Sequence, residues 1–337
     1  MEKVSRDFTQ LKLMEYLKHA LPANLSLVEE LSDVLELSND SIYRRIRGET
    51  ALSVDELAAI CKHFSLSFDA FLNSDEDGFV TFSYSRLNSK SDTYESYLIN
   101  VLNDLRRIAN FEEKQIIYAA EDIPLFYHFH HPELAAFKMF YWQKSIMNLP
   151  EFENKKFSKE IITDEFISLT DQILKCYLQI PSIEIWSDET ICSTLKQIEF
   201  YWDSGIISSK GDALSICSHV ESMMANIKLQ AENSEKMSQG KSLAYTNYSL
   251  YLSDIMIGTN CILVDTNGVK SSYLSFNTFN TMTTNNSSFC TEIELWLGNL
   301  LKKSNLISGV AEKQRYQFFR RIEMQLEHLK GKIEESV

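Results

Sequence analysis

The chain has 337 residues, of which 44% are hydrophobic and 24% charged, and its formal net charge at pH 7 is −14. This is ordinary globular composition, and a chain of this length can form two or three folded units without disulfides. The six cysteines are scattered without a C-x-x-C pair, which excludes a recognisable zinc cluster or disulfide framework and indicates a cytoplasmic protein. With no run of 18 apolar residues and no secretory signal pattern, we expect no membrane partner.

The N-terminal 75 residues predict an all-helical domain. Apolar residues recur there at three- and four-residue spacing, the period of a helix with one buried face. Ser26 with Glu29, and again Ser53 with Glu56, form the S-x-x-E capping-box pattern, and Gly48 is placed to end a helix with a positive φ. The predicted helices span about 7–21, 26–35, 39–47, 53–64 and 67–72.

The small, acidic stretch NSDEDG at 73–78 predicts a linker to a larger region, 79–337. That region is expected to be a helix-rich α+β regulatory or oligomerisation region, so the chain as a whole is mainly α with a smaller α+β part. Its clearest β feature is a hairpin around the Asn267-Gly268 turn signal. Shorter strands are predicted at 79–84, 115–119 and 183–186, and loops at 232–241 and 277–288. The polar loop makes a division near 233–242 an alternative.

Residues 26–72 carry the most informative pattern. A helix, the break Glu36-Leu37-Ser38, a second helix ending in Arg-Gly, and a capped third helix follow one another. The stretch SLVEELSDVLELSNDSIYRRIRGETALSVDELAAICKHFSLSFDAFL resembles phage-repressor-like DNA-binding proteins, and SNDSIYRRIRGE resembles the BetR-like branch of helix-turn-helix regulators. The resemblance implies a sequence-specific transcriptional regulator that binds double-stranded DNA, with the helix at about 39–47 in the major groove.

The geometry of that helix is compatible with such a role. Each residue turns by about 100°, so Ile42 and Ile46 lie about 40° apart and face the core, with Arg44 roughly opposite. An arginine can bind guanine O6 and N7 together or clamp a phosphate, and the start of the helix offers free N–H groups to a phosphate. The expected DNA-binding residues are Ser38, Asn39, Asp40, Ser41, Tyr43, Arg44, Arg45 and Arg47.

Two positions depart from the phage-repressor-like pattern, because Arg45 stands where an apolar residue is usual and Ile46 where a glutamate is usual. The alternative is that the arginines form a solvated face of a protein-interaction scaffold. The acidic total charge also predicts weak non-specific DNA binding, since phosphate contacts need Lys and Arg.

Other candidate sites are weaker. His128, His130, His131 and Glu133 could be metal ligands, but Pro132 and surrounding aromatic residues favour a packed segment instead. Glu199, Asp203 and Asp212 have no spacing that implies acid–base catalysis, and no nucleotide-binding or hydrolase motif occurs. We therefore expect no enzyme activity, no catalytic residues, no metal and no cofactor.

The region after the linker is expected to dimerise, to sense an unidentified small-molecule or protein effector, or to do both, since small DNA-binding domains usually gain affinity by pairing on two half-sites. A narrow apolar seam in the last helix is the candidate dimer contact, with packing on the preceding helix through Trp296 and Leu300 as the alternative. The seam consists of Phe319, Ile322, Leu326 and Leu329. Aromatic residues that could line a ligand pocket, or belong to the core, are Tyr141, Trp142, Trp186, Phe200, Tyr201, Trp202 and Trp296.

Overall fold

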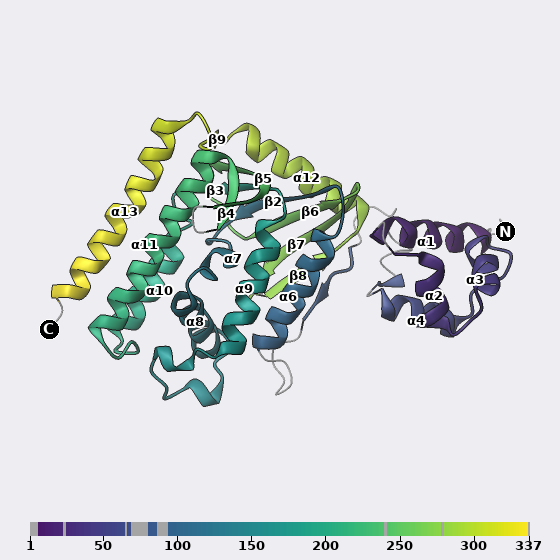
Figure 1. Ribbon diagram of the computed structural model, residues 1–337, viewed down its shortest axis with the longest axis horizontal. Coiled ribbons are helices and arrows are strands. Elements are labelled where there is room, and N and C mark those ends of the chain that lie inside the picture. Colours follow the sequence, from purple (N-terminus) through teal and green to yellow (C-terminus); the bar gives the residue numbers. More distant parts are fainter. Residues whose placement is uncertain are drawn as a thin grey trace.

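The computed structural model describes residues 6–22, 25–64, 66–68, 80–85, 94–238, 241–277 and 280–335. Four helices at the N-terminal end lie beside one another, apart from the rest of the molecule in Figure 1. They are α1 (Arg6–Ala20), α2 (Leu27–Leu35), α3 (Asn39–Ile46) and α4 (Val54–His63). Their apolar faces form a separate core, to which Leu13, Met14, Leu17, Leu31, Ile42 and Ile60 contribute. The linker predicted at 73–78 lies outside the described residues, as does most of the helix predicted at 67–72.

Local signals determine where these helices begin and end. The left-handed conformation of Glu36, with φ of 53°, ends α2, and Gly48 follows α3 with φ of 74°, as predicted. The capping box of Ser53 and Glu56 is confirmed, with both hydrogen bonds formed. The one predicted at Ser26 is wrong: Ser26 precedes α2, but its side chain makes no capping hydrogen bond.

One mixed sheet organises the remaining chain, with the order β1-β8-β7-β6-β2-β3-β5-β4 and with β9 beside β5. β2, β3 and β5 are parallel neighbours, whereas β2 pairs antiparallel with β6. Strand pairing therefore changes from parallel on one side of β2 to antiparallel on the other. In chain order the strands are β1 (Ser83–Tyr84), β2 (Lys114–Ala120), β3 (Ser182–Trp186), β4 (Glu235–Ser238), β5 (Lys241–Leu252), β6 (Cys261–Thr266), β7 (Val269–Phe276), β8 (Asn280–Thr284) and β9 (Asn305–Leu306).

The predicted hairpin is confirmed as β6 and β7, and Asn267 and Gly268 both take positive φ in its turn. Two predicted loops are wrong: 277–288 contains β8, and 232–241 contains the end of a helix and β4. β5 was not expected from the sequence. Since β3 pairs with β5 and β2 with β6, the segments on either side of 233–242 belong to one continuous sheet.

Helices cover both faces of the sheet. Alternate β2 residues point in opposite directions, so that Ile116 and Tyr118 join the large core and Ala119 joins a smaller one. The smaller core is covered by α12 (Ser287–Lys302). The large core receives residues from α6 (Tyr94–Ala109), α7 (Leu125–His128), α8 (Pro132–Tyr141), α9 (Asp164–Leu178), α10 (Cys192–Asp203), α11 (Lys210–Asn233) and α13 (Glu312–Glu335). Short π and 3₁₀ segments occupy Trp142–Ile146, Pro150–Phe152 and Lys159–Ile161.

The last helix, α13, lies along α11, as Figure 1 shows. Phe319, Ile322, Leu326 and Leu329 are all at most 5% exposed, so the apolar seam is already buried within the chain. The predicted dimer contact through this seam is therefore wrong. The alternative of packing on α12 is also wrong, because the seam belongs to the large core and Leu300 to the smaller one. Among the described residues, no helix has both the length and the apolar character needed to cross a bilayer.

The serines that precede α2 and α4, Ser26 and Ser53, allow a matched test of capping. Replacing Ser53 with Ala should lower the free energy of unfolding by about 1 kcal/mol, because it removes a side chain that accepts from the Glu56 backbone N–H. Ser26→Ala should have a much smaller effect, since no such bond exists there. Denaturant unfolding followed by circular dichroism compares them, and equal losses for the two variants would contradict this account of α4.

Candidate functional site

The outward side of α3 holds most of the residues that the sequence pointed to. Ile42 is fully buried and Ile46 packs partly against the same core, which orients the helix as predicted. Six of the eight expected DNA-binding residues are exposed, and we call them the α3 face: Ser38, Asn39, Asp40, Tyr43, Arg44 and Arg47. Ser41 is half-buried, and its hydroxyl lies 3.1 Å from that of Ser38 at the start of the helix.

Arg45 does not belong to the α3 face. Its guanidinium donates to Glu56 Oε1 over 2.5 Å and to the Ser41 carbonyl over 3.2 Å, and its side chain is only 15% exposed. The hydrogen bond from Arg45 is the main reason why the pKa of the Glu56 carboxyl is lowered. Arg45 thus joins α3 to the start of α4, a structural contact that the arginine run in the sequence did not reveal.

The two remaining arginines of the run differ in their partners. Arg47 pairs with Glu49 at 2.6 Å, although both side chains are more than half exposed. The side chain of Arg44 makes no hydrogen bond or ion pair with any residue that the structure describes, although its backbone carbonyl accepts from the Glu49 and Thr50 N–H groups. Gln10 of α1 holds the end of α3 and the segment that follows it. Its amide donates to the Arg45 and Thr50 carbonyls and accepts from the Leu52 N–H.

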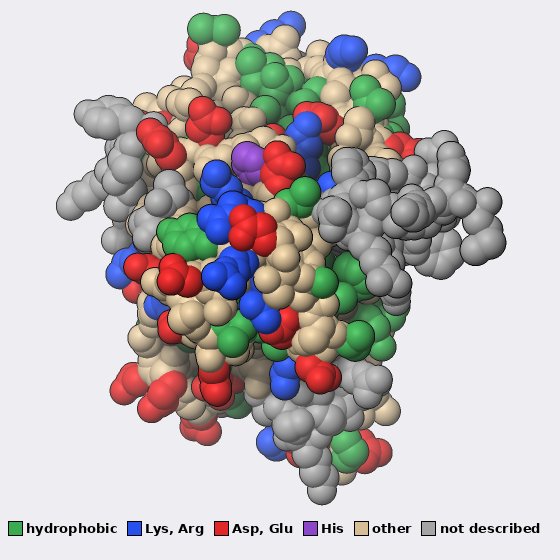
Figure 2. Space-filling model, turned by 90° about the vertical axis from the view of Figure 1, so that its right-hand side faces the viewer, with side chains coloured by type: hydrophobic (Ala, Val, Ile, Leu, Met, Phe, Trp, Pro, Cys, Tyr) green, Lys and Arg blue, Asp and Glu red, His purple; other side chains and the backbone are tan. Residues whose placement is uncertain are grey.

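Figure 2 looks onto the end of the molecule that carries α1–α4. Lys and Arg side chains gather across the centre of this surface, with Asp and Glu side chains among them. The exposed basic residues on these helices and at their ends include Lys12, Lys18, Arg44, Arg47 and Lys62. The same helices and their ends also carry exposed carboxylates, so the basic side chains lie among acidic ones. These carboxylates include Glu15, Glu29, Asp33, Glu36, Asp40, Glu49 and Asp55.

A second candidate site is a cavity of about 350 Å³, which we call the α6 pocket. It lies between α6 and the β2, β6, β7 and β8 strands, and its walls are mostly apolar, with Val101, Leu105 and Ile262 among them. Many of its polar groups lie where β2 ends, where the chain enters β6 and at the start of α10. They include Glu121, Asp122, Ser193, Thr259 and Asn260.

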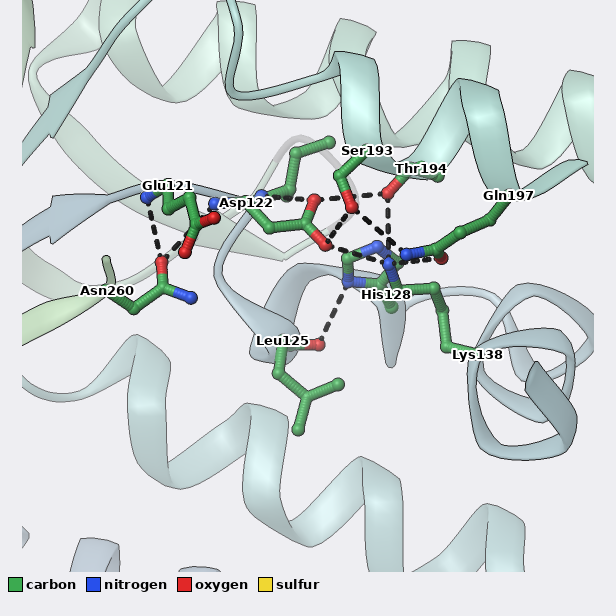
Figure 3. A network of polar contacts seen from close by, with 10 residues as sticks. Glu121, Asp122, Leu125, His128, Lys138, Ser193, Thr194, Gln197 and Asn260 are labelled. Atoms are coloured by element: carbon green, nitrogen blue, oxygen red, sulfur yellow. Dashed lines mark hydrogen bonds and ion pairs between the residues drawn. The ribbon is translucent and has the colours of Figure 1, made fainter. Parts of the chain in front are cut away.

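Asp122 is the centre of a polar network beside this pocket (Figure 3). Its Oδ2 accepts from Lys138 Nζ at 3.0 Å and from Ser193 Oγ at 3.2 Å. Lys138 also donates to Thr194 and Gln197, so its three N–H donors are all used. Burial has the largest single effect on the pKa of the Asp122 carboxyl and raises it. The charge and hydrogen bond of Lys138, with smaller contributions from His128 and the Ile123 N–H, together lower the pKa by more, so the net shift is downward. The network holds the end of β2 against α8 and α10.

The histidine segment lies on α7 and the turn after it, and not on a strand. His128 is fully buried with Nδ1 3.3 Å from the Leu125 carbonyl, and burial lowers its pKa to about 3. His131 stacks on His219, which pairs with Glu133 at 3.2 Å. No group of three or more His, Cys, Asp or Glu residues in the described part of the chain is arranged to hold a metal.

The aromatic residues singled out in the sequence do not line the α6 pocket. Trp142, Trp186 and Tyr201 are core residues, whereas Phe200 and Trp296 are exposed. The pocket instead takes its aromatic surface from Tyr97, Tyr118, Phe126 and Tyr273. No pattern in the sequence indicates this set, because its members come from four separate elements.

A buried ion pair lies deeper in the large core. Glu184 on β3 is inaccessible and accepts from Tyr127 and Tyr177 at 2.6 and 2.5 Å, and from the Trp186 indole at 3.0 Å. Lys236 on β4 is also inaccessible, with Nζ 3.7 Å from Glu184 and 3.4 Å from the centre of the Tyr177 ring. Because both side chains are inaccessible to solvent, we interpret the pair as a structural cluster that joins strands to helices.

Comparison with models of protein families, with curated proteins and with solved structures found no match. The arguments for function therefore depend on the α3 face and the α6 pocket themselves.

The buried Lys236 predicts an unusual pH dependence. Burial lowers its pKa from 10.5 to about 7, so above pH 7 the folded chain has lost a proton that the unfolded chain keeps until about pH 10.5. The unfolded state then binds more protons, and the free energy of unfolding gains a contribution that rises with pH from 7 upward. Lys236→Met removes this contribution, so the stability of the wild type relative to the variant should increase between pH 7 and pH 9.

Denaturant unfolding at several pH values measures this difference. Lys196→Met is the control, because Lys196 is exposed on α10 and its replacement should shift stability by a constant amount. A wild-type-minus-variant difference for Lys236→Met that stays flat over the same range would show that Lys236 does not lose its proton in the folded chain.

Proposed function

We propose that this chain is a cytoplasmic, sequence-specific DNA-binding transcriptional regulator in which α2 and α3 act as a helix-turn-helix. The observation that carries the proposal is the α3 face: a helix anchored by Ile42 presents Tyr43, Arg44 and Arg47 to solvent. A helix of this width fits the major groove, where arginine can bind a guanine through two hydrogen bonds.

The exposed residues divide into two roles under this proposal. Arg44 is the leading base contact, because its side chain makes no hydrogen bond or ion pair with the described residues. Ser38 and Asn39 lie at the exposed start of α3, where free backbone N–H groups can meet a phosphate. Arg47 can contact DNA only by exchanging its pair with Glu49. Arg45 is proposed to support the domain from within and not to read bases.

The net charge of the chain and the small size of α3 support binding to DNA as a dimer. The net charge of −14 opposes tight binding to arbitrary DNA, and a single short helix offers few base contacts. We propose that the chain binds as a homodimer on two half-sites, through a surface of the α+β region other than the buried α13 seam.

The rival proposal is a protein-interaction scaffold, which would use the same exposed helix to contact another protein and not DNA. Selection of bound sequences from random duplexes separates the two, since a scaffold would enrich no sequence.

Arg44→Ala should weaken binding to the selected sequence by about 5- to 150-fold, the equivalent of ~1–3 kcal/mol for a base contact. Its fold should be unchanged, because Arg44 is exposed and faces away from Ile42. Fluorescence anisotropy with a labelled duplex at fixed salt gives the affinities. Lys62→Ala, on the exposed side of α4, is the charge-matched control and should alter binding to all sequences alike. If Arg44→Ala selects the same sequences with wild-type affinity, α3 does not read the bases.

A further inference from the structure

The charged side chains that line the α6 pocket in the described part of the chain are all acidic. Among the described residues, its charged groups are Asp104, Glu121 and Asp122, and no Lys, Arg or His lines it. Its walls are apolar and aromatic, as in most sites for small organic molecules, and its volume of about 350 Å³ lies at the small end of their usual range. The pocket therefore offers negative charge next to an apolar cavity.

The three carboxylates differ in how far they are neutralised. Asp122 is paired with Lys138 at 3.0 Å, and Asp104 with Arg107 at 3.0 Å. Glu121 makes no ion pair with any residue in the described part of the chain. Figure 3 shows why Lys138 cannot pair with the carboxylates of both Asp122 and Glu121. Asp122 points toward Lys138, whereas Glu121 points to the opposite side, next to Asn260. Once the two pairs are taken into account, the pocket retains the charge of Glu121.

Two further polar groups at the pocket lack partners among the described residues. Tyr118 is 94% buried, since only 6% of it is exposed, and its hydroxyl, on a side chain that lines the pocket, has no hydrogen-bond partner there. The Asn260 Oδ1 accepts from the Glu121 and Asp122 backbone N–H groups, which leaves its Nδ2 without a bond to described residues. The Tyr118 hydroxyl and the Asn260 amide N–H groups are therefore available to hydrogen-bond a polar group of a ligand in the pocket.

We propose that the α6 pocket binds a small organic amine, with its ammonium group at Glu121 and an aromatic or branched apolar body between α6 and the sheet. The ammonium donates to the Glu121 carboxylate, and the Tyr118 hydroxyl supplies an additional acceptor. Tyr97 and Tyr273 line the pocket, and aromatic rings in a pocket wall favour a cation or a flat apolar ring. A carboxylate in the same place would meet Glu121 with like charge.

This proposal does not depend on DNA binding, so it is tested on the full chain without DNA. Isothermal titration with 2-phenylethylamine, 2-phenylethanol and 3-phenylpropanoate compares a cation, a neutral molecule and an anion of similar body. We expect the amine to bind at least tenfold more tightly than the alcohol, and the carboxylate not to bind. An alcohol or carboxylate that binds as well as the amine, or no binding of the amine at millimolar concentration, would overturn the proposal.

Variants locate the binding at the pocket. Glu121→Gln should weaken amine binding by about fivefold or more while leaving alcohol binding unchanged, as expected for the loss of a partly exposed ion pair. Glu112→Gln, at an exposed carboxylate outside the pocket, is the matched control and should change neither. Val101→Trp should fill the cavity and abolish binding of both molecules, with thermal unfolding as the check that the chain still folds. Unchanged amine affinity in Glu121→Gln would place the ligand elsewhere.

Discussion

The buried carboxylate of Glu184 is the constraint on which the arrangement of the α+β region depends. A charge removed from water must be matched by hydrogen-bond donors, and here these come from α7, α9, β3 and β5. Tyr127, Tyr177, Trp186 and Tyr248 supply them, and Lys236 adds a cation from β4. Any shift of one of these elements would leave the carboxylate short of a partner, so the cluster favours a single relative placement of strands and helices.

That placement also produces the α6 pocket. β2 runs parallel to β3 and antiparallel to β6, so the end of β2 and the start of β6 lie at the same edge of the sheet. Glu121 and Asp122, which follow β2, are thereby brought next to Asn260, which precedes β6. The buried Lys138 neutralises one carboxylate of this pair and leaves the other available. Polar residues at the carboxyl end of parallel strands are a common arrangement for ligand sites in α/β sheets.

The N-terminal helices are held by a different set of contacts. Asn285, before α12, donates a hydrogen bond to the Tyr16 hydroxyl on α1 and so joins these helices to the sheet region. Within these helices, a tertiary contact gives Arg45 a different role from the one that the sequence predicted. The sequence places it in a run of three arginines, but its proximity to Glu56 makes it a connector between α3 and α4. Arg44, one residue earlier, is turned by about 100° and remains exposed. The α3 face was therefore largely predictable from helical periodicity, except where a partner from another helix intervened.

The sequence by itself determined the features that depend on neighbouring residues: helix periodicity, the Ser53–Glu56 cap, the end of α3 at Gly48 and the Asn267-Gly268 turn. Each of these is a matter of backbone geometry or hydrogen bonds within a few residues. The tertiary structure decided the rest. β5 and β8 exist because their partners are present, and Lys236 is buried because β4 lies beside that sheet. The α6 pocket combines residues from 97 to 281, and no local period encodes which distant segments pair.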